Sequence, residues 1–274
     1  AELEERAMDL SIILRDWPYD EEQEANNIRM VPGIDGALKV QIRLKHGVIQ
    51  WDADGRPDGT KPYGCESVLF YCLNLVQKHD RISSHKSGRR FRLDRGLVTE
   101  LADEMEQFEE RGAAFFTLGD FARARRDIRH NLRILDIIRN YYRDPEIAAE
   151  LERHRPRLLM SEARCAASLH MQRDEAHEAV VALNQGIREI ETVRVERGTE
   201  GDVSQSHERQ ALIDLRRSIR ERYDVPLTDE ELLDTLKAEQ EVAIEEENYE
   251  LAARLRDKIN TVLARLSKEG GVYH

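Results

Sequence analysis

Three carboxylates gather in one short, glycine-rich string of the chain. Asp52, Asp54 and Asp58 lie within seven residues of one another. Alternating aspartates supply the hard oxygen ligands that Ca²⁺ prefers. However, Arg56 stands where a further oxygen ligand is needed, and no glycine or glutamate falls at the positions of an EF-hand loop. We therefore favour a rigid turn in which the aspartates accept hydrogen bonds from backbone amides, with a cation site as the weaker alternative.

The histidines and cysteines do not form a recognisable site. His170 and His177 are seven positions apart, but no third metal ligand accompanies them. The three cysteines are odd in number and lack a CxxC pair, which favours a reducing cytoplasm over a disulfide framework. No nucleophile motif and no P-loop is present. We expect no cofactor and no catalysis, and the carboxylate string is the one place where an enzyme site could lie.

Two arginine-rich runs could bind an anionic partner. Residues 81–95 carry six basic side chains against one acid, and residues 123–143 carry seven arginines against two aspartates. Such runs are typical of patches that bind nucleic acid or an acidic protein segment. The alternative is pairing with acidic segments of the same chain or a second copy, and the net charge of −12 favours it. The candidate residues are Arg89, Arg90, Arg92, Arg123, Arg126, Arg129 and Arg133.

The overall composition favours a helical protein. Aromatic residues make up only 6% of the 274 residues, which suits helix packing by Leu, Ile and Ala. A charge of −12 argues against broad affinity for nucleic acids or anionic membranes. No apolar run approaches the roughly 18–20 residues that a membrane-spanning helix needs. We expect no membrane association.

The first 92 residues predict a small α+β module. Leu3–Leu14 has helical spacing, whereas Leu38–Leu44 alternates apolar and polar residues as in a strand with one buried face. Residues 48–51 can return as a second strand, and Asn27–Val31 can add a third. A helix is expected over Cys65–His79, followed by a basic connection over Arg81–Arg92.

Residues 93–197 predict two antiparallel helical pairs. Residues 113–124 resemble a tetratricopeptide repeat (TPR) in their small and aromatic residues, and residues 166–176 echo them weakly. The copies are offset by roughly 54 residues, well above the roughly 34 of a standard repeat, and the second lacks the glycine and the aromatic. We therefore expect TPR-like pairing with long helices or an insertion at residues 143–156. The four predicted helices are Leu97–Leu118, Phe121–Tyr142, Ile147–Met171 and Glu175–Val195.

After a linker and helix over residues 198–227, residues 228–268 predict a helical hairpin. Thr228 and Glu231 form a capping box, and Asn248 can end the first helix and cap the second. Between Asp229 and Asp257, eleven acids face three bases, a local charge of −8, which favours a basic partner. Two such helices bury little surface between themselves, so we expect their apolar seam to need another surface.

The run Tyr249–Ile259, YELAARLRDKI, resembles the UVR motif, a small hairpin named after the repair proteins UvrB and UvrC. The resemblance implies protein docking, as in the UvrB–UvrC contact and in adaptors and regulators of Clp-type proteases. It does not imply excision activity, because the helicase and nuclease motifs of those enzymes are missing. The string at Asp54–Gly59, DGRPDG, is similar to one in uncharacterised bacterial proteins that also end in a UVR motif. The residues expected to contact a partner are Leu251, Leu255, Arg256, Ile259 and Val262.

Together these patterns predict a mainly α protein with a small α+β module, a TPR-like body and a UVR-like hairpin. The expected function is that of a non-catalytic bacterial adaptor in the cytoplasm, which docks a protein partner or a second copy of itself. The alternative is an accessory factor for nucleic acid, related to DNA repair, that uses the arginine patches.

Overall fold

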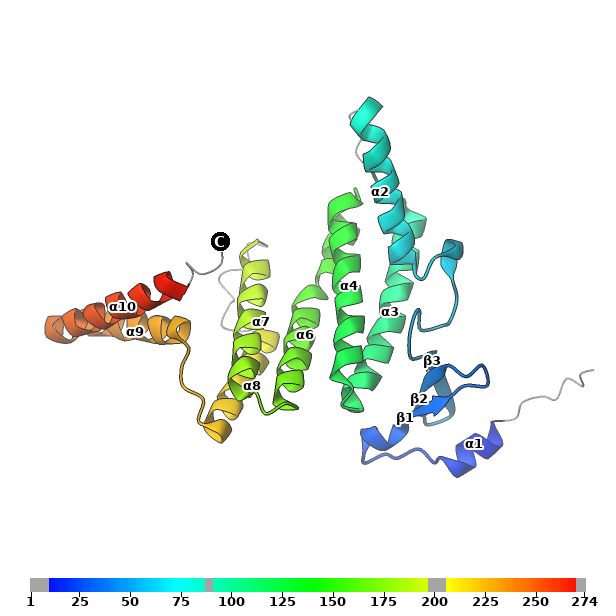
Figure 1. Ribbon diagram of the computed structural model, residues 1–274, viewed down its shortest axis with the longest axis horizontal. Helices are drawn as coiled ribbons and strands as arrows, with labels where there is room; N and C mark the ends of the chain where they lie inside the picture. The colour runs from blue at the N-terminus through cyan, green and yellow to red at the C-terminus, as the bar shows by residue number, and fades with distance from the viewer. Residues whose placement is uncertain (1–9, 87–90, 197–205, 270–274) are drawn as a thin grey trace, which may run out of the picture. The chain divides into compact units, whose positions relative to one another are not determined.

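The computed structural model describes residues 10–86, 91–196 and 206–269 (Figure 1). The chain forms two compact units, Ala1–Asp214 and Leu215–His274. Helices dominate the described part, and one small antiparallel sheet lies near the N-terminus. The mainly α fold with a small α+β module is therefore confirmed. Within the described ranges, no helix has the length and apolar character needed to cross a bilayer.

The N-terminal sheet has three antiparallel strands in the order β1-β2-β3. The predicted strand pair is present, and the possible third strand is β1. The prediction of one buried face was wrong for β2, because Lys39, Gln41 and Arg43 are buried as well as Val40. These polar side chains stay below the surface because they are paired: Lys39 binds Asp52 at 2.6 Å, for example. The elements are α1 Ser11–Asp16, η1 Glu24–Asn27, β1 Ile28–Pro32, β2 Leu38–Leu44 and β3 Gly47–Asp52.

Three long helices follow the sheet. The helix expected over Cys65–His79 begins at Val68 and continues to Lys86, so the prediction that residues 81–92 form a connection was wrong for their first part. A main core joins these helices through fully buried residues such as Leu101 and Ile134. A second core packs the sheet onto α3 and α4. The helices are η2 Pro62–Gly64, α2 Val68–Lys86, α3 Arg95–Thr117 and α4 Phe121–Tyr141.

The next helices differ from the prediction at one point. The single helix expected over Ile147–Met171 is two, because the chain breaks at Arg153 and His154. Pro156 explains the break: it lies in the first turn of α6, where its missing N–H is not needed, and it would interrupt a continuous helix. The helices are α5 Pro145–Glu152, α6 Arg155–Met171, α7 Ala176–Glu196 and α8 His207–Tyr223.

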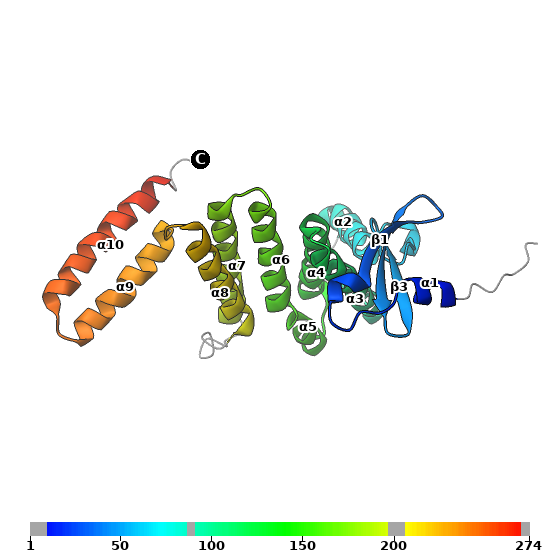
Figure 2. The same cartoon turned by 90° about the horizontal axis from the view of Figure 1, so that it is seen from below.

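The helices α3 and α4 form one packed pair, and α6 and α7 form another. Helix α4 lies between α3 and α6 and packs against both (Figure 2). Antiparallel helical pairing is therefore confirmed, while the assignment to the tetratricopeptide class remains a prediction. The linker expected near residues 198–206 lies largely outside the described residues.

The turns of the two pairs share one backbone pattern. In the first, the amide of Asp120 donates to Phe115 O, and Gly119 has a positive φ of 76°. In the second, the amide of Glu175 donates to His170 O, and the residue with positive φ, 59°, is Asp174. Both are Schellman turns, in which the residue after the helix adopts the left-handed conformation. Asp174 therefore occupies the position of Gly119, which explains why the second copy lacks the glycine.

Gly186 allows α7 to approach α6 closely. A Cβ at this position would lie 2.4 Å from the Cβ of Ala163. We expect Gly186→Ala to lower the free energy of unfolding by about 1–3 kcal/mol, because the helices must separate. Gly112→Ala is the matched control, since its nearest neighbour is Asp127 Cβ at 3.4 Å. Urea denaturation of both variants checks the expectation, and an equal loss of stability in the two would contradict it.

The C-terminal unit contains a closed helical hairpin, α9 Asp229–Glu245 and α10 Tyr249–Glu269. The predicted capping box of Thr228 and Glu231 is present, and Asn248 caps α10 through Leu251 N. The apolar seam is buried within the unit, which differs from the expectation that it needs another surface. Ala243 and Ala252 lie in this seam and let the two helices pack tightly.

Candidate functional site

The residues expected to contact a partner divide into two groups. Leu255, Ile259 and Val262 are buried in the seam between α9 and α10, and Leu255 is only 3% exposed. A partner cannot reach them while the hairpin is closed, so we revise their role to holding the helices together. Leu251 and Arg256 are exposed and remain accessible to a partner.

Four exposed apolar residues of the hairpin lie near the turn that joins its two helices. We call residues 238–251 the hairpin tip. Val242 and Ile244 are each 51% exposed, Tyr249 is 68% exposed and Leu251 is 41% exposed. The sequence reasoning missed the first three, because it followed the buried seam and not the residues flanking it. A concavity of about 380 Å³ lies here, lined by Ala238, Glu239, Val242, Ala243, Glu246, Leu251 and Leu255.

The hairpin tip is uniformly acidic. It contains six glutamates and no lysine or arginine: Glu239, Glu241, Glu245, Glu246, Glu247 and Glu250. Exposed apolar side chains surrounded by negative charges are typical of a surface that binds a positively charged protein.

The carboxylates of the Asp52–Asp58 string face different partners. Asp52 pairs with Lys39, whereas Asp54 accepts hydrogen bonds from Arg123 and Arg126 on α4. Asp58 accepts from the amide of Thr60 at 2.9 Å. The described residues hold no group of three His, Cys, Asp or Glu side chains arranged to bind a metal.

Ion pairs dominate the electrostatics of this string. Burial would raise the pKa of Asp54, but hydrogen bonds from Arg123 and Arg126 outweigh it and lower the pKa. The string therefore has the geometry of a loop held on α4.

A buried arginine fixes the same loop to α3. Arg111 is fully buried and forms a two-pronged pair with Asp127 of α4, at 2.7 and 2.8 Å. Its Nη1 also donates to the carbonyls of Asp52 and Gly55, at 2.7 and 2.8 Å. One side chain thereby joins two helices and the loop.

A second buried group, Glu104, lies nearby. Its carboxylate accepts from the amides of Val68 and Leu69 at the start of α2, and it is 2.9 Å from His130 Nε2. The His130 ring stacks on Phe108 with centroids 3.7 Å apart. Sequence reasoning missed Glu104 and His130, because they are 26 positions apart and share no motif.

The candidate arginine patch is largely paired within the chain. Arg123 binds Asp120 and Asp54, Arg126 binds Asp54 and Asp127, and Arg129 binds Glu162. Arg92 and Arg133 are exposed, and neither has an ion pair within the described ranges. Arg89 and Arg90 lie outside the described residues. The pairing within the chain weakens the interpretation of this patch as a nucleic-acid surface.

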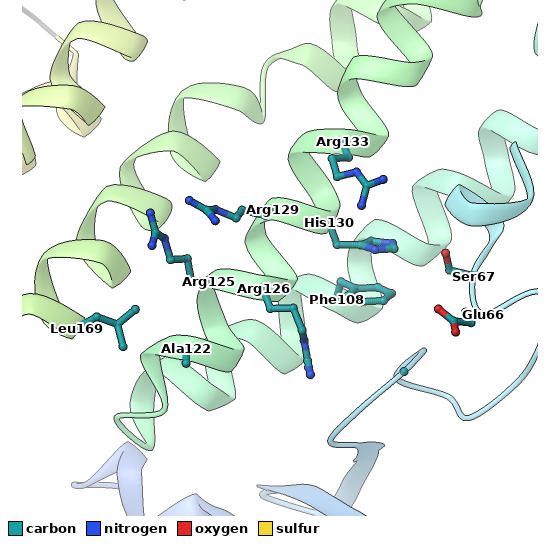
Figure 3. A pocket seen from close by; sticks show the side chains of 11 residues that line it. Glu66, Ser67, Phe108, Ala122, Arg125, Arg126, Arg129, His130, Arg133 and Leu169 are labelled. Carbon is teal, nitrogen blue, oxygen red and sulfur yellow. The ribbon is translucent and has the colours of Figure 1, made fainter. Parts of the chain in front are cut away.

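A groove of about 720 Å³ runs along α4 beside these arginines (Figure 3). Its lining residues come from the 52–60 loop, the start of α2, and the helices α3, α4 and α6. They are Gly55, Glu66, Ser67, Phe108, Ala122, Arg125, Arg126, Arg129, His130, Arg133 and Leu169.

Comparison with known proteins identifies one family. The model described as the UvrB/uvrC motif, UVR, matches residues 230–263. This range covers α9 and most of α10, so the C-terminal hairpin carries a UVR motif, and the predicted resemblance is confirmed. No curated protein and no solved structure matches the chain.

Proposed function

We propose that the protein is a non-catalytic adaptor that docks a protein partner through the hairpin tip. The observation that carries this proposal is the pair of exposed apolar side chains Val242 and Leu251, which line one concavity at the otherwise acidic tip. UVR motifs occur in DNA-repair proteins and in protein-interaction contexts, which supports a docking role.

The chemistry of the tip defines the partner. Its apolar residues favour a partner surface with an exposed aliphatic or aromatic patch, and its six glutamates favour lysines or arginines around that patch. The closed seam gives the tip a fixed shape, so docking does not require the hairpin to open. The helical pairs α3/α4 and α6/α7 offer a further surface for a second contact, as expected for TPR-like pairing.

The alternative role in binding nucleic acid has less support. This role depends on free arginines, but Arg123, Arg126 and Arg129 are engaged in ion pairs. Among the patch residues that the structure describes, Arg92 and Arg133 are exposed without an ion pair. The three thiols are free, with Cys72 and Cys165 buried, which agrees with the reducing compartment that we propose.

A capture experiment with paired variants tests the docking proposal. We expect the double variant Val242→Ser/Leu251→Ser to lose the bound proteins that the unaltered chain captures from lysate of its source cells. Leu263→Ser is the matched control, because Leu263 is also exposed, at 44%, but lies on α10 outside the tip. Quantitative mass spectrometry of the captured proteins is the measurement.

One result of this capture experiment would contradict the docking proposal. If the tip variant and the Leu263 control retain the same proteins in the same amounts, the tip does not dock a partner. Circular dichroism shows whether both variants keep their helices, so a loss of capture is not mistaken for unfolding.

A further inference from the structure

The groove along α4 contains a set of basic side chains that docking through the hairpin does not use. Its lining includes four arginines and one histidine against a single carboxylate, that of Glu66. Three of these arginines pair with carboxylates outside the lining, whereas Arg133 has no ion pair within the described ranges and adds a positive charge to the groove of a chain that carries −12 overall. A cationic group in a concave surface is an arrangement that focuses an electrostatic field on an anion.

The basic side chains of the groove form two stripes on α4. Arg126, His130 and Arg133 are spaced i, i+4 and i+7, which places them on one face of the helix. Figure 3 shows these three on the side that faces Ser67 and Glu66. Arg125 and Arg129 extend toward the other side, and both bind Glu162 of α6. The first stripe therefore contains the arginine of the groove that has no ion pair within the described ranges, Arg133, and this side is available to a ligand.

Neighbouring groups hold two members of this stripe in place. Arg126 donates to the carbonyl of Ala53 at 2.8 Å and to Asp54 and Asp127 at 2.7 and 2.9 Å. His130 is fixed by its contact with Glu104. Side chains that are already ordered lose little entropy when a ligand binds, which favours affinity.

Arg133 and Ser67 supply donors that the fold leaves available. Arg133 is exposed and has no ion pair within the described ranges, so its guanidinium can bind two oxygens of one anion. Ser67 Oγ accepts a hydrogen bond from Phe70 N at 3.0 Å, and this leaves its hydroxyl proton to donate. A positively charged guanidinium together with a hydroxyl donor is typical of sites that bind phosphate.

We propose that this groove binds the phosphate group of a small, hydroxyl-bearing ligand. Arg133 and the Ser67 hydroxyl would bind the phosphate, with the remaining N–H groups of Arg126 beside them, and Glu66 would accept a hydrogen bond from a ligand hydroxyl. The volume of about 720 Å³ is in the roughly 300–1,000 Å³ range of small-molecule sites. A long polyanion is disfavoured, because the net charge of the chain repels it beyond the groove.

Calorimetric titration of the full chain tests the proposal, with inorganic phosphate and ribose 5-phosphate as probes. We expect ribose 5-phosphate to bind more tightly than inorganic phosphate, and its Kd to increase with NaCl concentration. Arg133→Gln should weaken binding by about tenfold to one-hundredfold, as expected when a charge-assisted hydrogen bond is lost. Arg139→Gln is the control: Arg139 is on the same helix, pairs with Asp136 and does not line the groove.

Three outcomes would overturn the proposal. The first is no binding of either probe at low salt by a chain with a normal circular dichroism spectrum. The second is an equal effect of the Arg133 and Arg139 variants, which would indicate a general effect of charge. The third is much tighter, steeply salt-dependent binding of a twelve-nucleotide RNA, which would assign the groove to nucleic acid. Arg133 is exposed, so loss of folding does not obscure its variant.

Discussion

Replacing Arg111 by methionine is expected to lower the free energy of unfolding by about 3–5 kcal/mol, because the substitution leaves the buried carboxylate of Asp127 without its main partner. Both side chains of this pair are fully buried. The variant also removes the donor to the carbonyls of Asp52 and Gly55, so the loop loses its attachment to α3. Urea denaturation followed by circular dichroism measures the loss.

A double variant separates the effect of the unpaired buried charge from the effect of the changed side-chain shape. In Arg111→Met/Asp127→Leu, no isolated buried charge remains, so we expect part of the stability to return. The recovery should be incomplete, because the two loop carbonyls still lack their donor. Arg157→Gln is the control: its exposed pair with Glu109 should contribute less than about 1 kcal/mol. A loss below about 1 kcal/mol in Arg111→Met itself would contradict the expectation.

The second large effect is expected at Glu231, which joins α8 to α9 within the C-terminal unit. Its carboxylate pairs with Arg216 at 2.6 Å, contacts Arg220 and completes the capping box with Thr228. Burial would raise the pKa of Glu231, but hydrogen bonds from Arg220 and Thr228 and the charge of Arg216 lower it from 4.5 to about 2. The folded state therefore favours the ionised carboxylate.

This lowered pKa makes the stability of the C-terminal unit depend on pH. The contribution is fully present above pH 4.5 and is lost as the pH falls toward about 2, because protonation then occurs in the folded state as well. It corresponds to roughly 3 kcal/mol at neutral pH. We expect Glu231→Gln to be less stable than the unaltered chain by a similar free energy at pH 7. This difference in stability should decrease in acid.

Thermal denaturation of both proteins at a series of pH values checks this expectation. Glu250→Gln is the matched control, because Glu250 forms an exposed pair with Arg254 one helix away. If the difference in melting temperature between the unaltered chain and Glu231→Gln stayed constant from pH 7 to pH 3, the charge of Glu231 would not be the cause of the lost stability.

Local signals in the sequence were enough to predict the helices, the strand pair and the hairpin. The capping box at Thr228 and the alternation of Leu38–Leu44 are such signals, because each depends on residues a few positions apart. The prediction left open long helices or an insertion at residues 143–156, and the structure has a separate short helix there, which ends before Pro156. The turn at residues 172–174 was predicted, but its Schellman geometry was not, because no glycine marks the left-handed position that Asp174 occupies.

The candidate sites were harder to predict than the fold. Leu255, Ile259 and Val262 were chosen as a docking surface because apolar spacing identifies a face, but not whether its own partner helix covers it. The contacts of Arg111 with Asp127 and of Glu104 with His130 depend on how α3 and α4 pack, which no motif encodes. The arginine run was visible, but two of the carboxylates that pair with it, Asp54 and Glu162, come from other elements.

The distribution of cysteine and tryptophan lets the two units be observed separately. All three cysteines and both tryptophans lie in Ala1–Asp214, and residues 215–274 contain neither. Burial raises the pKa of Cys72 and of Cys165 to about 12, so both thiols are protonated and shielded from alkylating reagents in the folded state. Labelling of Cys72 and Cys165 and tryptophan fluorescence therefore report unfolding of the first unit alone. Melting of the hairpin changes neither thiol labelling nor tryptophan fluorescence. The part of the total change in ellipticity that these two methods do not account for therefore reports unfolding of the C-terminal unit, without any added label.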